Sequence, residues 1–164
     1  MKLLIVTQVV DSEDPILGFF TRWIEELATR VEQVKVICLK EGNHTFSKNT
    51  QVYSLGKERG RRSSIITAVC FKWLAWNLRA DYDAVLVHMN PEYILVAGSL
   101  WRVLGKQVAL WYNHPHGGLK LRLASRLAHT VFYTSPYAAS ARLSNAVRMP
   151  AGIDTDLFAP APVP

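Results

Sequence analysis

Cysteine and the common nucleotide-binding motifs are scarce or missing in this chain of 164 residues. Its two cysteines, Cys38 and Cys70, lie in apolar segments without CxxC or metal-like spacing, which favours buried free thiols and a reducing cytoplasm. The first loop has one glycine, so the GxGxxG fingerprint of NAD-binding domains is absent. The chain also lacks a Walker lysine motif, GxSxG and HExxH, which argues against NTPases, serine hydrolases and zinc proteases.

Long apolar runs are missing as well. Lys72, Arg102 and Lys106 interrupt the most apolar segments, so no stretch reaches the roughly 18 to 20 residues that span a bilayer. The opening "MKLLIVTQVVDSED" reaches acidic residues too early for a secretory signal and reads as a strand. With 49% hydrophobic and 20% charged residues, we expect one soluble or peripheral globular domain over residues 1–150.

After the first 50 positions, acidic residues are fewer than basic residues, and the whole chain carries a net charge of +6. The excess lies in "GKERGRR" (56–62), in Lys120, Arg122 and Arg126, and in Arg142 and Arg148. Such charge suits an anionic membrane surface, a phosphorylated ligand or nucleic acid; a plain solvated surface is the alternative. No nucleic-acid reading motif is present, so we expect no nucleic-acid partner. The candidate membrane or anion surface consists of Lys57, Arg59, Arg61 and Arg62.

Apolar β-branched runs alternate with helical patterns along the whole chain. Several runs are apolar at consecutive positions, as in parallel strands that are covered on both faces. The alternation predicts a Rossmann-like three-layer α/β domain with a mostly parallel sheet of about seven strands. Strands are expected at 2–7, 33–39, 51–55, 83–88, 107–112, 130–134 and 145–149, and helices at 18–31, 63–79, 91–104, 118–128 and 136–142.

Three strand-to-helix junctions share one sequence device, an N-capping residue followed by proline. They are Asp14-Pro15, Asn90-Pro91 and Ser135-Pro136, and "NHPHGG" (113–118) is the junction after the fifth strand. In a parallel sheet these junctions meet at the carboxyl edge of the strands, where α/β proteins bind ligands. This edge is therefore the predicted site.

His114 and Gly18 are candidate site residues at this edge. The imidazole of His114 can hydrogen-bond and position a hydroxyl-bearing substrate, although capping of its own turn is an alternative role. His114 and His116 lack an evident third ligand, so we expect no metal. Gly18 either lets a phosphate or hydroxyl oxygen approach the helix or serves close packing.

The expected helix 63–79 has an unusually wide apolar stripe. Residues 65, 66, 69, 70, 73, 74 and 76 share a half-circle, but Phe71 and Leu78 lie outside it. Such a helix rests on a membrane interface or a partner domain, or is wedged between the sheet and a neighbouring helix.

Three segments carry a resemblance to a known family: the opening "MKLLIVTQVVDSEDPILGFFTRWIEELA", "ALWYNHPHG" (109–117) and above all "MPAGIDTDLFAP" (149–160). The last is similar to the interdomain signature of family 4 glycosyltransferases. Along its whole length the chain resembles the amino-terminal half of these retaining, two-domain GT-B enzymes. It departs from them in the single glycine of the first loop and in Ala151, where the family often has Asn or His.

The resemblance implies an acceptor-binding domain over 1–150, followed by the start of an interdomain linker at 151–164. It implies that His114 is the catalytic residue near the transferred sugar. A nucleotide sugar would be the co-substrate, bound by a C-terminal donor domain, and this domain itself would need no cofactor. The implied acceptor-binding residues are Asp14, Gly18, Phe19, Asn90, Glu92, His116 and Gly117.

The paired glutamates of the family's donor domain have no counterpart here, so we expect this chain alone to be inactive. Its partner would be that donor domain, in the same or a separate chain, in the cytoplasm or at the inner membrane face. A hypothesis from another class is a free-standing, non-catalytic scaffold that forms a homodimer through the surface meant for the missing half.

Overall fold

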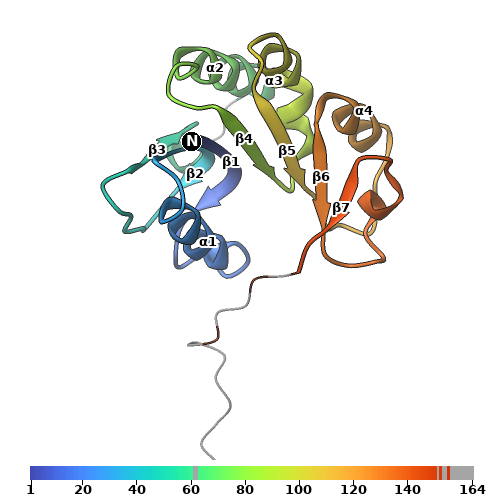
Figure 1. Ribbon diagram of the computed structural model, residues 1–164. Helices are drawn as coiled ribbons and strands as arrows, with labels where there is room; N and C mark the ends of the chain where they lie inside the picture. The colour runs from blue at the N-terminus through green and yellow to red at the C-terminus, as the bar shows by residue number, and fades with distance from the viewer. Residues whose placement is uncertain (61–62, 151, 153–154, 156–164) are drawn as a thin grey trace, which may run out of the picture.

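A computed structural model describes residues 1–60, 63–150, 152 and 155. It contains one seven-stranded sheet in the order β3-β2-β1-β4-β5-β6-β7, with every neighbouring pair parallel (Figure 1). The strands are β1 (Lys2–Val10), β2 (Gln33–Glu41), β3 (Thr50–Ser54), β4 (Ala84–His88), β5 (Gln107–Trp111), β6 (Thr130–Tyr133) and β7 (Ala146–Arg148). The α-helices are α1 (Gly18–Ala28), α2 (Ser64–Asn77), α3 (Pro91–Val103) and α4 (Leu119–Leu127), and the 3₁₀ helices are η1 (Lys57–Arg59) and η2 (Ala139–Arg142).

The strand order reverses between β1 and β4, which pair in parallel side by side. On one side of β1 the sheet continues with β2 and β3. On the other side it continues with β4, β5, β6 and β7. This is the switch point at which doubly wound sheets open a crevice for ligands. The predicted Rossmann-like parallel sheet is confirmed.

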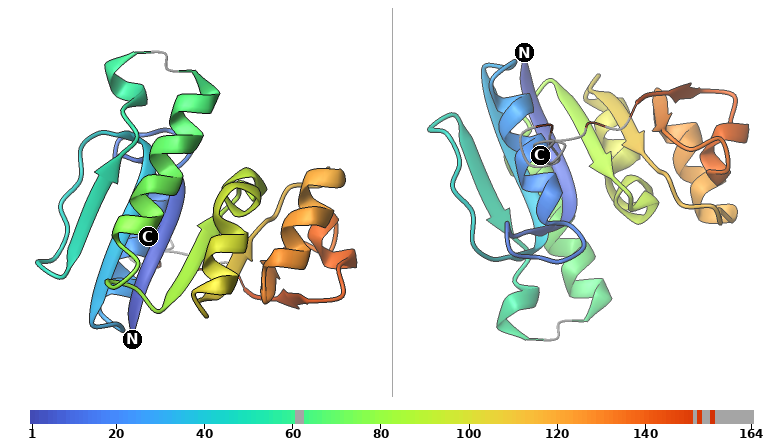
Figure 2. Two further views of the ribbon diagram at one scale, coloured as in Figure 1. Left: turned by 90° about the horizontal axis from the view of Figure 1, so that it is seen from above. Right: turned by 90° about the horizontal axis from the view of Figure 1, so that it is seen from below.

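Helices cover both faces of the sheet, and this explains the consecutive apolar residues of the strands. On one face α1 packs Phe20, Ile24 and Ala28 against residues of β1 and β2. On the other face α2, α3 and α4 bury a second cluster that includes Phe71 and Trp101 (Figures 1 and 2). Alternate residues of β1 belong to different clusters, so each position in the strand is buried by one helical layer or the other.

A buried hydrogen-bond chain joins the helices of the larger cluster. The Tyr82 hydroxyl donates to the Ala75 carbonyl oxygen at 2.7 Å and accepts from the Trp101 indole N–H at 3.0 Å. Burial raises the pKa of Tyr82 to about 12, so the phenol keeps its proton. The chain satisfies the polar atoms of two large aromatic side chains and fixes α2 relative to α3.

The expected start of α1 at residue 18 is confirmed, whereas the Asp14-Pro15 pair does not itself begin the helix. The Asp14 carboxylate does cap backbone N–H groups, those of Ile16 and Leu17, at 3.0 and 2.9 Å. It caps a turn that precedes the helix, and these bonds lower the pKa of the carboxyl group. The helix also ends at Ala28 rather than at residue 31, because the chain turns back to enter β2 at Gln33.

The expected α-helix over 136–142 is also wrong. A turn follows Ser135-Pro136, and only the short η2 forms after it. Backbone groups here form bonds between residues three apart, and two groups of the segment bond to the loop after β5. The Ala139 N–H donates to the His114 carbonyl oxygen, and the Ser140 hydroxyl donates to the Tyr112 carbonyl oxygen. Tertiary partners therefore replaced the helical hydrogen bonds that the sequence pattern favoured.

The two cysteines are free thiols, as predicted. Cys38 is buried and Cys70 is half-buried. Burial raises the pKa of Cys38 to about 12, so this thiol is not nucleophilic at neutral pH. None of the helices in the described ranges is long and apolar enough to cross a membrane.

Candidate functional site

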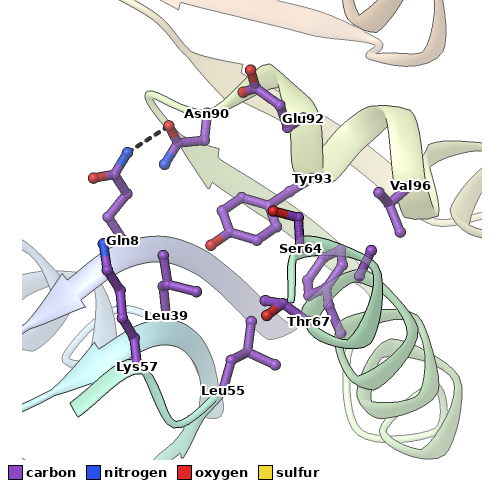
Figure 3. A pocket seen from close by; sticks show the side chains of 12 residues that line it. Gln8, Leu39, Leu55, Lys57, Ser64, Thr67, Asn90, Glu92, Tyr93 and Val96 are labelled. Carbon is purple, nitrogen blue, oxygen red and sulfur yellow. Dashed lines mark hydrogen bonds between the residues drawn. The ribbon is translucent and has the colours of Figure 1, made fainter. Parts of the chain in front are cut away.

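The carboxyl edge of the sheet holds a pocket of about 580 Å³ at the switch point. The tips of β1 and β2, the segment after β3 and the first turns of α2 and α3 surround it (Figure 3). Its walls combine apolar side chains with hydroxyl, amide and charged groups, the composition typical of small-molecule sites. The lining residues are Gln8, Leu39, Leu55, Lys57, Ser64, Thr67, Ala68, Phe71, Asn90, Glu92, Tyr93 and Val96.

An amide pair closes one side of this switch-point pocket. The Gln8 side-chain nitrogen donates to the Asn90 Oδ1 atom at 2.8 Å, which joins β1 to the start of α3 (Figure 3). Asn90 occupies the N-cap position of α3, but its side chain forms no capping hydrogen bond. Its Nδ2 atom is buried and has no partner in the described structure. Because an unpaired buried donor costs about 1–3 kcal/mol, a ligand oxygen admitted by a small rotation of Asn90 would recover that energy.

A strained turn places Asn90 at the pocket. Met89 has a φ of 64°, and the Asn90 N–H donates to the His88 carbonyl oxygen at 2.9 Å, closing a three-residue turn. Turns with a positive φ at the central residue are rare, and a non-glycine residue there costs about 1–3 kcal/mol. Met89 is held by its own N–H, which donates to the Trp111 carbonyl oxygen at 2.7 Å. The turn lets α3 begin directly over the tip of β4.

The other polar groups of the pocket are three hydroxyl groups, the ammonium of Lys57 and the carboxylate of Glu92. Burial raises the pKa of Tyr93 to about 12, so its phenol stays protonated. Ser64 and Thr67 add hydroxyl groups from α2. Glu92 is partly neutralised by Lys120, whose ammonium lies 3.1 Å from its carboxylate. Neutral donors and acceptors beside apolar side chains suit a ligand with hydroxyl groups and a hydrophobic portion.

His114 lies at the carboxyl edge, as predicted, and is exposed. Its Nδ1 atom is 3.1 Å from the His116 backbone nitrogen and 3.2 Å from the His116 carbonyl oxygen. The backbone N–H can only donate and the carbonyl oxygen can only accept, so the tautomer of the ring decides which of these two contacts is a hydrogen bond. In either tautomer Nδ1 bonds to its own turn, so the turn-capping role is present. Nε2 is left for another molecule.

Two further pockets lie along the same edge. A pocket of about 450 Å³ lies between the starts of α3 and α4 and shares Asn90 and Glu92 with the switch-point pocket. A pocket of about 790 Å³ includes His116 and Gly117 and faces the segment before η2. The structure thus brings Asn90 and Glu92 together and places His116 and Gly117 in a separate hollow. His114 lines none of these three pockets.

The first-loop candidates Asp14, Gly18 and Phe19 do not line these three pockets either. A Cβ atom on Gly18 would approach the Ser12 carbonyl oxygen to 2.8 Å, so the glycine serves close packing of the loop on α1. Gly117 is similar, because a Cβ atom there would lie 2.5 Å from Leu121 Cδ2. Phe19 is half exposed and contacts His88 edge to face.

Sequence reasoning missed Gln8, Tyr93 and His88. Gln8 is the polar residue that interrupts the apolar run of β1, and this interruption was the available signal. His88 ends β4 and is buried on the α1 face, where its ring stacks on Phe20 with centroids 3.8 Å apart. Its Nδ1 atom lies 3.3 Å from the Thr7 hydroxyl. Burial lowers the pKa of His88 to about 4, so the ring is neutral at physiological pH.

Of the predicted basic surface, Lys57 lines the switch-point pocket and Arg59 is exposed, 3.7 Å from the Glu58 carboxylate. Arg61 and Arg62 lie outside the described residues, as does the predicted linker over 151–164 apart from Gly152 and Thr155. Within the described ranges, no three His, Cys, Asp or Glu side chains are grouped so that they would hold a metal ion.

Comparisons with known proteins give structural neighbours only. No protein-family model and no curated protein sequence matches the chain. The structure is similar to MurG from Acinetobacter baumannii, with a TM-score of 0.57 and 15% identity over 96% of this chain and 47% of that one. It is also similar to UDP-GlcNAc 2-epimerase from Methanocaldococcus jannaschii, with a TM-score of 0.52 and 12% identity over 84% of this chain and 40% of that one.

The fold is that of one GT-B half. This confirms the architecture that the sequence resemblance implied, although the likeness is to GT-B proteins in general and not to family 4 in particular. The chain spans less than half the length of either neighbour.

Proposed function

We propose that this chain is the acceptor-binding half of a retaining GT-B glycosyltransferase of the family 4 type. The observation that carries the proposal is the pocket at the switch point, with amide and hydroxyl groups beside apolar side chains and the unpaired amide nitrogen of Asn90. Sugar hydroxyl groups both donate and accept hydrogen bonds, as the Gln8–Asn90 pair and the Tyr93 phenol do. The GT-B fold of the chain supports the same reading.

The residues of the edge have distinct roles in this proposal. Gln8, Asn90 and Tyr93 bind the hydroxyl groups of the acceptor, while Leu39 and Phe71 contact its apolar part. His114 donates from Nε2 to the sugar that is transferred, and in that tautomer Nδ1 accepts from the His116 N–H. A second domain facing this edge brings the nucleotide sugar, because donor and acceptor must be held together for the reaction to become effectively unimolecular.

The test measures the binding of short-chain glycosides to the isolated chain. Saturation-transfer NMR with a panel of methyl and hexyl glycosides is the method. We expect hexyl glycosides to bind more tightly than methyl glycosides because of the apolar wall. Asn90→Ala should weaken binding about fivefold, since one hydrogen bond in a buried site is worth on the order of 1 kcal/mol.

Gln107→Ala is the matched control, because this exposed amide begins β5 at the opposite edge of the sheet. It should leave glycoside binding unchanged. Equal affinity of wild type, Asn90→Ala and Gln107→Ala would remove the pocket from the proposal, and an absence of glycoside binding would contradict the acceptor role.

A further inference from the structure

The outward face of α2 carries a cluster of exposed apolar side chains. Five of the 14 exposed large apolar residues in the described ranges lie on this one helix, with between 47% and 76% of their surface exposed. The other nine are distributed over several elements. Isolated exposed apolar residues need no explanation, whereas a contiguous patch marks a binding surface. The α2 patch consists of Ile65, Ile66, Val69, Trp73 and Trp76.

The wide apolar stripe of the helix is divided between its exposed side and its buried side. Five residues of the half-circle are exposed, whereas Cys70 and Leu74 pack against the core beside the buried Phe71 and Leu78. The helix is apolar on nearly all sides, so packing against the sheet uses only one of its faces. Burial inside the domain therefore does not account for the remaining apolar side chains.

Basic residues adjoin the α2 patch at both ends, with Glu58 as the acidic residue among them, 3.7 Å from Arg59. The helix contains Lys72 and no acidic residue, and Lys57 and Arg59 lie on the 3₁₀ helix that precedes it. Arg79 follows the helix and places its guanidinium 4.2 Å from the centre of the Trp76 ring. Among the described residues, neither Lys57 nor Lys72 forms an ion pair.

We propose that the α2 patch docks this protein on the surface of an anionic lipid bilayer. Tryptophan and aliphatic side chains enter the boundary between headgroups and acyl chains, and lysine and arginine bind the negative surface. The net charge of +6 acts in the same direction. A bilayer is favoured over a protein partner because the patch is a single convex helix face with a positive border and no acidic side chain on the helix itself.

Docking in this orientation brings the switch-point pocket to the membrane. The inner side of α2 supplies Ser64, Thr67 and Phe71 to that pocket, while Ile65 and Val69 lie on the outer side of the same turns. Figure 2 shows η1 and the first turns of α2 projecting past the carboxyl ends of β1 and β2. Ligands carried by the bilayer would thus reach the pocket beside the docked helix. The docking itself does not depend on the sugar-transfer proposal.

The experiment is flotation of the full chain with two kinds of vesicle, pure phosphatidylcholine and equal parts phosphatidylcholine and phosphatidylglycerol. We expect binding to the anionic vesicles that falls with added salt, together with a blue shift of tryptophan fluorescence that is reduced in Trp73→Phe. Lys72→Gln should lower the partition coefficient about fivefold, as expected for one basic residue near the surface. The double variant Ile65→Gln, Val69→Gln should lower it on the order of tenfold or more, because apolar burial is lost.

Matched controls use exposed residues elsewhere. Val103→Gln with Leu123→Gln and, separately, Lys48→Gln should leave vesicle binding unchanged, because these residues lie on α3, α4 and the loop before β3. Circular dichroism confirms that each variant is folded. The proposal is overturned if anionic vesicles do not bind, if α2 and control variants lose binding equally, or if light scattering shows a dimer that the Ile65 and Val69 substitutions dissociate. If the vesicles do not bind, the binding of glycosides to the switch-point pocket is still tested by its own experiment.

Discussion

A single buried imidazole, that of His88, makes the stability of this fold depend on pH. Burial lowers its pKa from 6.5 to about 4 in the folded protein, so the unfolded chain binds more protons between these two values. The contribution of the neutral His88 ring to the free energy of unfolding is fully present above pH 6.5 and is lost as the pH falls towards about 4. The loss amounts to roughly 3 kcal/mol of unfolding free energy.

We expect His88→Leu to flatten the pH dependence in this window, whatever its effect on stability at neutral pH. Urea unfolding followed by circular dichroism at a series of pH values measures the slope. Thr7→Val removes the hydroxyl beside the ring but keeps the ring buried, so it should retain the slope of the wild type. A wild-type slope in His88→Leu would show that burial of this ring is not the cause.

At the scale of the element, the end of α3 depends on one glycine. Gly105 has a φ of 68°, its N–H donates to the Arg102 carbonyl oxygen, and the Lys106 N–H donates to the Trp101 carbonyl oxygen. These two bonds form a Schellman cap. A Cβ atom at this position would meet no neighbour, so the need for glycine lies in the backbone alone.

We therefore expect Gly105→Ala to lower the free energy of unfolding by about 1 kcal/mol, the cost of a left-handed conformation for a residue with a side chain. Gly105→Asn should lose less, because asparagine tolerates this conformation better. Denaturant unfolding of the three proteins gives the order glycine, asparagine, alanine. Equal free energies of unfolding for the wild type, Gly105→Asn and Gly105→Ala would show that a side chain at position 105 does not strain the backbone of the cap.

At the scale of the whole molecule, the sheet is unevenly covered. In the described part of the chain, α1 covers β1 and β2 on its face, and no helix lies over β5 to β7 on that side (Figure 1). The chain matches less than half of each structural neighbour. In the proposed function, a second body carries the donor site and this chain carries the acceptor site.

Under that proposal the isolated chain should bind glycosides but not nucleotide sugars. Isothermal titration with a panel of uridine and guanosine diphosphate sugars is expected to show no tight binding, because the proposed donor site belongs to the other half. A longer protein that continues into a second α/β domain should bind one of them. Tight donor binding by the isolated chain would contradict the assignment of this half to the acceptor.

Much of the architecture could be predicted from the pattern of residues. Consecutive apolar runs indicated parallel strands, and a parallel sheet necessarily gathers Asn90 and His114 at one edge. The Asn90-Pro91 junction does begin a helix, whereas Asp14-Pro15 and Ser135-Pro136 begin turns. The difference arises because a cap signal is local, and tertiary partners decide whether a helix continues after it.

The sequence by itself determined the class of fold, since alternating strands and helices with doubly covered strands allow few other arrangements. Only the tertiary structure decided the pocket, the burial of His88 and the face of α2 that remains exposed. Gln8 and Asn90 are 82 residues apart, and no local pattern contains their 2.8 Å contact. The apolar residues of α2 exceed what one packing surface can bury, so the choice of the inner face depended on the shape of the sheet and of α3.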